Sequence, residues 1–232
     1  MTTPDRPHTF AAFDADLQGL RAGVLSMADL AARQFRDAIQ ALDRRDLGLA
    51  AQVLAGEREL NALQVSLDDA CGRVIIRHQP AAIDLREVIA SLHSIGDFER
   101  IGDESKKIAG KVAALDGSEP QLMARIVAMA SGASSMVQRA IDAYRQRDAS
   151  AATALGAIDD VIDEERDRLV ADISARIAAS GERITSYRAA RWLDLILVVQ
   201  SIERVADHAE DVAEYVVNVV EGVDRRHGNL PG

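Results

Sequence analysis

The chain reads FERIGD at residues 98–103 and IERVAD at residues 202–207, two near copies of one short acidic motif. The glutamates of the two copies are 104 positions apart, and so are the aspartates. Residues four apart lie on the same face of a helix, with Cβ atoms about 5–6 Å apart. Each motif therefore predicts two neighbouring carboxylates, which repel each other unless a cation neutralises them. The four residues are Glu99, Asp103, Glu203 and Asp207.

The duplication extends beyond the two motifs. At the offset of 104, apolar positions of the same predicted helices coincide, as Ile95 and Val199 do. Further upstream, an offset of 102 aligns Arg45-Asp46 with Arg147-Asp148. The change of offset indicates a two-residue difference in a loop, which loops tolerate. A repeat of about 100 residues is too long for a solenoid unit and predicts a duplicated helical bundle.

Helix start and stop signals divide each copy into three helices. Asp46 and Asp148 each precede a periodic apolar run, as N-cap residues do. Pro80 and Gly181 follow the ends of two other runs. The predicted helices span residues 10–44, 47–77, 82–114, 120–146, 149–179 and 186–221.

The fold class that follows is all-α: six long helices as two tandem three-helix bundles related by a pseudo-two-fold axis. A composition of 48% hydrophobic but only 3% aromatic residues, with few Gly and Pro, agrees with helices packed through small aliphatic side chains. The third and sixth helices carry the most continuous apolar faces, so we expect them at the centre. The predicted repeats cover residues 10–115 and 119–222, with flexible tails at 1–9 and 223–232.

Charge and composition narrow the function classes. A net charge of −10 argues against nucleic acid as a partner, because phosphate contacts need a basic surface. The single cysteine excludes an internal disulfide. Neither a signal peptide nor a transmembrane segment is evident, so we expect a soluble cytoplasmic protein that reaches a membrane only through a partner.

Longer stretches around the motifs resemble the two signatures of the PhoU family. Residues 79–86 read QPAAIDLR and residues 96–109 read GDFERIGDESKKIA, which is similar to the first signature. Residues 202–214 read IERVADHAEDVAE, which is similar to the second, although Asp211 stands where that signature usually has Asn. The resemblance runs from about residue 10 to residue 222 and includes the duplication.

The resemblance implies a negative regulator of the bacterial phosphate-starvation response rather than an enzyme. Such proteins are adaptors between a phosphate ABC transporter, through its ATPase subunit, and a sensor histidine kinase. Their place is the cytoplasm, or the inner face of the membrane through these partners. Homodimers and higher oligomers are common in the family, and some members bind iron or other divalent metals through acidic residues spaced four apart.

The residues themselves favour a metal site in the second copy over one in the first. The carboxylates of Glu203, Asp207 and Asp211 form a ladder, with no Lys or Arg in register on that stripe of the helix. In the first copy Asp103 can pair with Lys107 one turn later. Hard divalent cations prefer oxygen ligands, so we expect Fe, Mn, Zn or Mg.

The candidate ligands fall into two sets. The primary candidates are Glu99, Asp103, Glu203, Asp207 and Asp211. The secondary candidates are Glu57, Asp159, Asp163 and His208. Because Asn61 occupies the place of Asp163 in the first copy, the two sites are expected to be unequal.

Three other interpretations remain open at this point. The acidic motifs could form only structural ion pairs. The chain could be a carboxylate metal store or a ferritin-like metal enzyme, although no Glu is followed by His three positions later, as that class requires. An acid–base hydrolase has the least support, because no nucleophile motif or phosphate-binding glycine loop accompanies the carboxylates.

Overall fold

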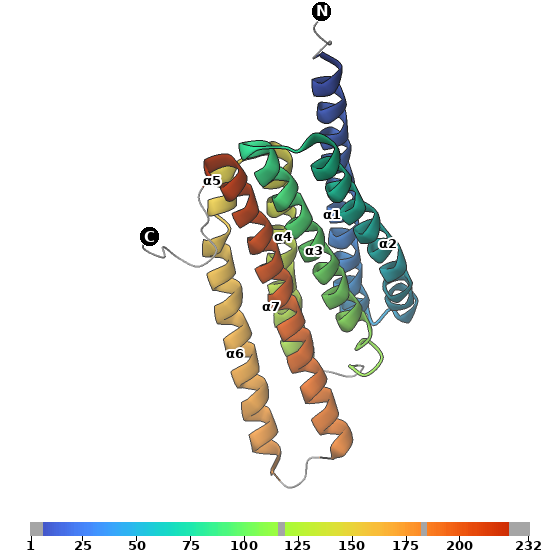
Figure 1. The fold of residues 1–232 in the computed structure, drawn as a ribbon. Helices are drawn as coiled ribbons and strands as arrows, with labels where there is room; N and C mark the ends of the chain where they lie inside the picture. The colour runs from blue at the N-terminus through green and yellow to red at the C-terminus, as the bar shows by residue number, and fades with distance from the viewer. Residues whose placement is uncertain (1–6, 116–118, 182–184, 223–232) are drawn as a thin grey trace, which may run out of the picture.

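The computed structural model describes residues 7–115, 119–181 and 185–222, and within these ranges every regular element is an α-helix. The helices are α1 (Pro7–Arg44), α2 (Leu47–His78), α3 (Ala82–Ala109), α4 (Pro120–Gln146), α5 (Ala149–Thr153), α6 (Gly156–Ser180) and α7 (Ser186–Glu221), shown in Figure 1. The prediction of six long helices is therefore confirmed, with α5 as a short addition.

The predicted cap residues begin and end the helices as expected. Asp46 Oδ1 accepts a hydrogen bond from the backbone N–H of Leu49 at 2.9 Å, and Asp148 Oδ1 accepts one from Ala151 at 3.0 Å. Gly181 follows α6 with a φ of 55°, a conformation that glycine adopts without strain. These bonds satisfy backbone groups that a helix end leaves unpaired.

The helix predicted at 149–179 is interrupted, which corrects the sequence-based expectation. The break at residues 154–155 turns the side chain of Leu155 into the core, where it is 1% exposed. Gly156 then begins α6 against Glu210 of α7; a Cβ at this position would lie 3.0 Å from Glu210 Oε1. Burial of Leu155 and the close approach at Gly156 override the helical periodicity of the sequence.

Two other boundaries differ from the prediction. The helix α3 ends at Ala109, and residues 110–115 form turns where the sequence predicted helix as far as residue 114. The helix α1 begins at Pro7, inside the predicted tail 1–9; proline is favoured in a first helical turn. Residues 1–6 and the predicted C-terminal tail, 223–232, lie outside the described residues.

The helices α3 and α7 pack against each other at the centre, as predicted from their apolar faces. The helix α1 packs on α3 and α4, while α2 covers α1 and α3, and α6 covers α4 and α7. Figure 1 shows α2 and α6 at opposite edges of the bundle, as a pseudo-two-fold axis between the repeats requires. The apolar residues inside the two acidic motifs, Ile101 and Val205, are fully buried, so the motif carboxylates point toward the outer helices.

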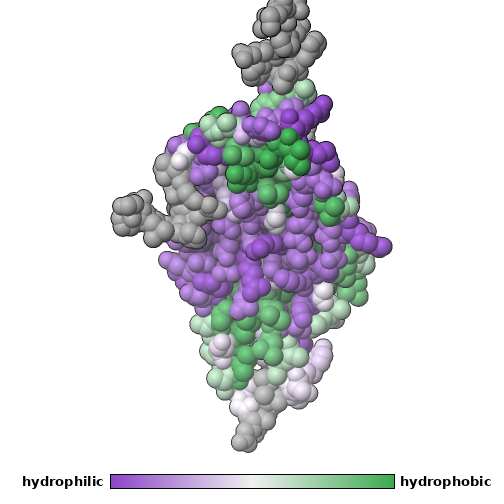
Figure 2. Space-filling model, viewed as in Figure 1, coloured by the Kyte–Doolittle hydropathy of each residue, from purple (hydrophilic) through white to green (hydrophobic). Residues whose placement is uncertain are grey.

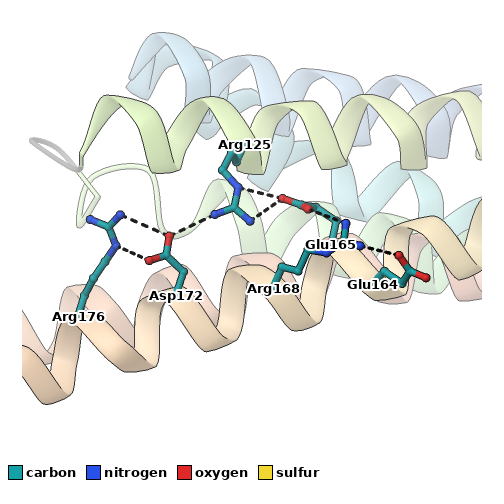
Figure 3. Close-up of polar contacts among 6 residues, drawn as sticks. All are labelled: Arg125, Glu164, Glu165, Arg168, Asp172 and Arg176. Carbon is teal, nitrogen blue, oxygen red and sulfur yellow. Dashed lines mark hydrogen bonds and ion pairs between the residues drawn. The ribbon is translucent and has the colours of Figure 1, made fainter.

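Ion pairs join α4 to α6 on the second repeat. Arg125 donates to Glu165 at 2.8 Å and to Asp172 at 3.2 Å, and Arg176 donates to the same Asp172 at 2.9 Å (Figure 3). All of these groups are partly exposed, so each pair contributes at most about 1 kcal/mol. The network orients α6, whose other face carries the acidic site described next.

In the described part of the chain, no helix carries an apolar stretch long enough to cross a bilayer.

Candidate metal centre

Three aspartates from α6 and α7 meet in the second repeat. Asp159 and Asp163 lie one turn apart on α6, and Asp207 faces them from α7. One carboxylate oxygen from each lies within 4.8 Å of the other two. Glu203 and Glu210 of α7 add their negative charges to the same group. We call these five residues the second acidic group.

Burial and mutual repulsion raise the pKa values of the carboxyl groups in the second acidic group. Burial raises the pKa of Asp159 to about 7, and the charges of Glu210 and Asp163 add to the effect. Burial likewise raises the pKa of Asp207 to about 6, together with the charges of Glu203 and Asp159. Partial burial also raises the pKa of both glutamates. A cation placed here would relieve the repulsion that raises these values.

Two oxygens of this group are buried without a hydrogen-bond donor, namely Oδ1 of Asp159 and Oδ1 of Asp163. Arg166 of α6 supplies one positive charge: it forms an ion pair with Glu203 and lies 3.5 Å from Asp163 Oδ1. The guanidinium is therefore shared between Glu203 and Asp163, and among the described residues no ion pair reaches Asp159 or Asp207. The all-oxygen donor set and its unpartnered atoms fit a hard divalent cation.

The first repeat offers a smaller acidic group. Glu57 of α2 lies near Glu99 and Asp103 of α3, and burial followed by the charge of Asp103 raises the pKa of Glu99. Lys106, however, forms an ion pair with Glu57 and is also attracted to Asp103. Among the described residues, this group does not repeat the close three-oxygen arrangement of the second repeat. The two sites are thus unequal in charge, as the sequence predicts.

The ion pair expected between Asp103 and Lys107 does not form in the described structure. Lys107 donates instead to the buried Glu104 at 2.7 Å, and Arg204 of α7 approaches Glu104 at 3.7 Å. The hypothesis that ion pairs alone explain the first motif is wrong in this detail, because the helix turns Glu104 and not Asp103 toward Lys107.

Two of the predicted ligands belong to a different cluster. His208 Nδ1 lies 3.0 Å from Asp97 Oδ1 of α3 and 3.9 Å from Asp211 Oδ2. Asp211, one turn after Asp207 on α7, therefore lies beside His208 and Asp97, with its side chain 45% exposed. The three side chains lie close enough to share an ion, but the buried Asp97 already has His208 as its partner.

Sequence reasoning missed three residues of these groups. Glu210 is absent from the candidate ligands although it lies on the same helix as Glu203, Arg166 lies on α6, and Asp97 lies outside the repeated motif. The sequence does contain one signal for Glu210. At the offset of 104 it corresponds to Lys106, which makes the second group more acidic than the first. The contacts of Arg166 and Asp97 depend on how α6 and α3 face α7, which the sequence pattern does not specify.

The fold and the site define a class: a tandem-repeat helical bundle that carries one acidic group between the second and third helices of each repeat. The PhoU domain matches the chain twice, at residues 24–112 and 126–216. The phosphate-specific transport system accessory protein PhoU homolog of Pseudomonas aeruginosa is 34% identical over 225 residues, which is 96% of this chain and 91% of that protein. The protein belongs to the PhoU family.

More distant relatives and solved structures agree. The PhoU protein of Escherichia coli K12 is 29% identical over 221 residues, covering 95% of this chain and 90% of its own length. The crystal structure of PhoU from P. aeruginosa matches with a TM-score of 0.85 at 34% identity, over 91% of this chain and all of that one. The phosphate transport system regulatory protein PhoU from Streptococcus pneumoniae matches with a TM-score of 0.82 at 24% identity, over 93% of this chain and all of that one, which supports the fold alone.

Proposed function

We propose that this protein is a cytoplasmic negative regulator of the phosphate-starvation response, an adaptor without catalytic activity. It would contact the ATPase subunit of a phosphate ABC transporter and a sensor histidine kinase. The observation that carries the proposal is the match, over nearly the full length of both chains, to proteins named as accessory to the phosphate-specific transport system.

The exposed face of α3 and α7 supports a role in protein contact. Figure 2 shows apolar surface toward both ends of this face, with a hydrophilic band between. Near the start of α3, Ile89 and Leu92 are 43% and 41% exposed; near the start of α7, Leu193 and Leu197 are 57% and 47% exposed. Exposed apolar side chains grouped beside polar ones are typical of protein-binding surfaces.

The second acidic group supports a divalent-metal site as part of this function. Asp159, Asp163 and Asp207 would supply oxygen ligands, and the negative charges of Glu203 and Glu210 would add to the attraction for a cation. A bound cation would link α6 to α7 and stiffen the second repeat. A stiffened second repeat would also favour a homodimer or higher oligomer. Light scattering with and without Mn²⁺ measures the oligomeric state.

A genetic complementation and a binding assay test the adaptor role. In a strain that lacks this gene, we expect a phosphate-starvation promoter to be active in phosphate-rich medium, and the wild-type gene to silence it. The purified protein should also capture the transporter ATPase subunit and the cytoplasmic part of the kinase. Two results together would overturn the proposal. The promoter would stay silent in the deletion strain in phosphate-rich medium, and the protein would capture neither partner with or without Mn²⁺.

A carboxylate metal enzyme or store is the second candidate, because three aspartate oxygens converge in the second repeat. Oxygen consumption after addition of Fe²⁺ distinguishes it from the adaptor. We expect no sustained turnover. Repeated turnover that Asp159→Asn abolishes would favour the enzyme.

A further inference from the structure

A cavity of about 90 Å³ lies between α1, α3, α4 and α7, and none of its lining residues belongs to the acidic groups. Its apolar wall is formed by Leu25, Ala90, Val216, Val219 and Val220. Its polar side is formed by Arg21, Glu87, Tyr144, Arg145, Arg147 and Tyr215.

Two guanidiniums share a single carboxylate on the polar side. Arg21 donates to both oxygens of Glu87, one of them at 2.7 Å, and Arg147 donates to Glu87 Oε2. The Glu87 side chain is only 7% exposed, whereas those of Arg21 and Arg147 are 34% and 43% exposed. Arg21, Arg147 and Glu87 together carry one net positive charge beside the cavity, which the nearby Asp84 partly offsets, in a protein whose net charge is −10.

Arg147 has hydrogen-bond donors that Glu87 does not use. Partial burial lowers the pKa of Arg147, and the neighbouring charge of Arg21 lowers it further, while Asp84 opposes the effect. An arginine presents five N–H donors. Among the described residues, the Arg147 side chain donates only to Glu87, which leaves donors that can face an anion.

We propose that this cavity binds a short-chain organic anion. The anionic group would lie on the guanidiniums of Arg21 and Arg147, where arginine forms paired hydrogen bonds to phosphate or carboxylate oxygens. The apolar chain would lie against Ala90 and the valines of α7. An apolar wall with a few converging polar groups is the usual composition of a small-molecule site. The proposal is independent of the phosphate-signalling and metal roles.

Calorimetric titration of the full-length protein with four probes tests whether the cavity needs both the anionic group and the apolar chain of the ligand. The probes are n-butyl phosphate, butyrate, inorganic phosphate and n-butanol. We expect at least one of the two chain-bearing anions to bind at least tenfold more tightly than inorganic phosphate and n-butanol, and the tighter of the two identifies the head group. Equal binding of inorganic phosphate, or binding of n-butanol as tight as that of the anions, would overturn the proposal. So would the absence of binding by both chain-bearing anions.

Matched variants locate the binding. Arg147 has a φ of 55° after α4, and Arg45 has a φ of 57° at the corresponding place after α1, away from the cavity. Asparagine tolerates this left-handed conformation, so Arg147→Asn and Arg45→Asn should both fold. We expect Arg147→Asn to weaken binding at least tenfold and Arg45→Asn to change it less than twofold.

A second variant tests the cavity itself while both arginines remain. Ala90→Leu adds atoms to the apolar wall, and we expect it to abolish binding of the chain-bearing anions while thermal melting shows a folded protein. Unchanged affinity in Arg147→Asn would overturn the assignment, as would unchanged affinity in Ala90→Leu.

Discussion

Asp159 has a carboxyl group whose pKa burial and neighbouring charges raise to about 7. An aspartate in the unfolded chain has a pKa of about 3.9. Between these values the folded state binds more protons than the unfolded state, so the stability contributed by this group falls as pH rises from about 4 to about 7 and stays at its lowest value above that. The group therefore destabilises the metal-free protein most at alkaline pH.

The predicted consequence is that Asp159→Asn stabilises the metal-free protein at pH 8 and has much less effect at pH 5. We expect a gain of about 1 kcal/mol at pH 8, or roughly 2–4 °C in melting temperature, after allowing for solvent screening of a half-buried group. Thermal melting in the presence of EDTA measures it. Asp43→Asn, on an exposed position of α1, is the control. A variant as stable as wild type at both pH values would contradict the prediction.

His208 links the two repeats through its hydrogen bond to the buried Asp97. Removing one partner leaves the other buried and unpaired, which costs about 1–3 kcal/mol. We expect His208→Ala to destabilise the protein by this amount in urea unfolding. Combining it with Asp97→Ala should cost less than the sum of the two single changes, because the interaction can be lost only once. Strict additivity would show that the bond contributes nothing.

At Gly102, α3 packs closely against Leu60 of α2 and Gln34 of α1. A Cβ at this position would lie 2.1 Å from Leu60 Cδ2 and 3.2 Å from Gln34 Oε1, and Leu60 is 1% exposed. In the second repeat Ala206 occupies the corresponding position, so the packing there accommodates a fully buried methyl group. The first repeat is thus packed more tightly at this level than the second.

Gly102→Ala should therefore destabilise the protein by about 1–3 kcal/mol, because the added methyl group forces the buried Leu60 side chain to move within the core. Gly96→Ala, six residues earlier on the same helix, meets no atom within 4 Å and should stabilise by up to about 1 kcal/mol through helix propensity. Chemical unfolding of both variants gives the comparison. Equal effects of the two substitutions would show that the contact with Leu60 does not limit the packing.

The sequence predicts the helices more completely than it predicts the acidic groups. The caps at Asp46 and Asp148 act locally, so the sequence predicted helix starts correctly. The break before Gly156 depends on a contact with Glu210 of another helix, which periodicity does not encode. The same limit applies to Asp211: its spacing places it one turn after Asp207, but its approach to Asp97 depends on how α3 packs on α7.

Across the whole molecule, the two repeats share a backbone plan but differ in charge at their acidic groups. At the offset of 104 Lys106 corresponds to Glu210, and at the offset of 102 Asn61 corresponds to Asp163. In the first repeat Lys106 already forms an ion pair with Glu57. A divalent cation would compete with Lys106 in the first repeat and with Arg166 at Glu203 and Asp163 in the second, but in the second it would also meet Asp159 Oδ1, which has no hydrogen-bond donor.

We therefore predict that Mn²⁺ stabilises the protein mainly through the second repeat. At a free concentration 100 times the dissociation constant, the gain should be about 2.7 kcal/mol. Asp159→Asn/Asp163→Asn should remove most of this gain, whereas Glu99→Gln/Asp103→Asn should leave most of it; thermal melting with Mn²⁺ and with EDTA measures both.

The reverse change tests whether charge alone makes the repeats unequal. Lys106→Glu together with Asn61→Asp gives the first repeat the acidic residues of the second. Because the backbone plan is shared, we expect this variant to bind more Mn²⁺ per chain than wild type in a calorimetric titration, at a cost in metal-free stability from the added repulsion. If its stoichiometry stays at the wild-type value, the difference between the repeats lies in how α2 and α6 are positioned, and not in the charges they carry.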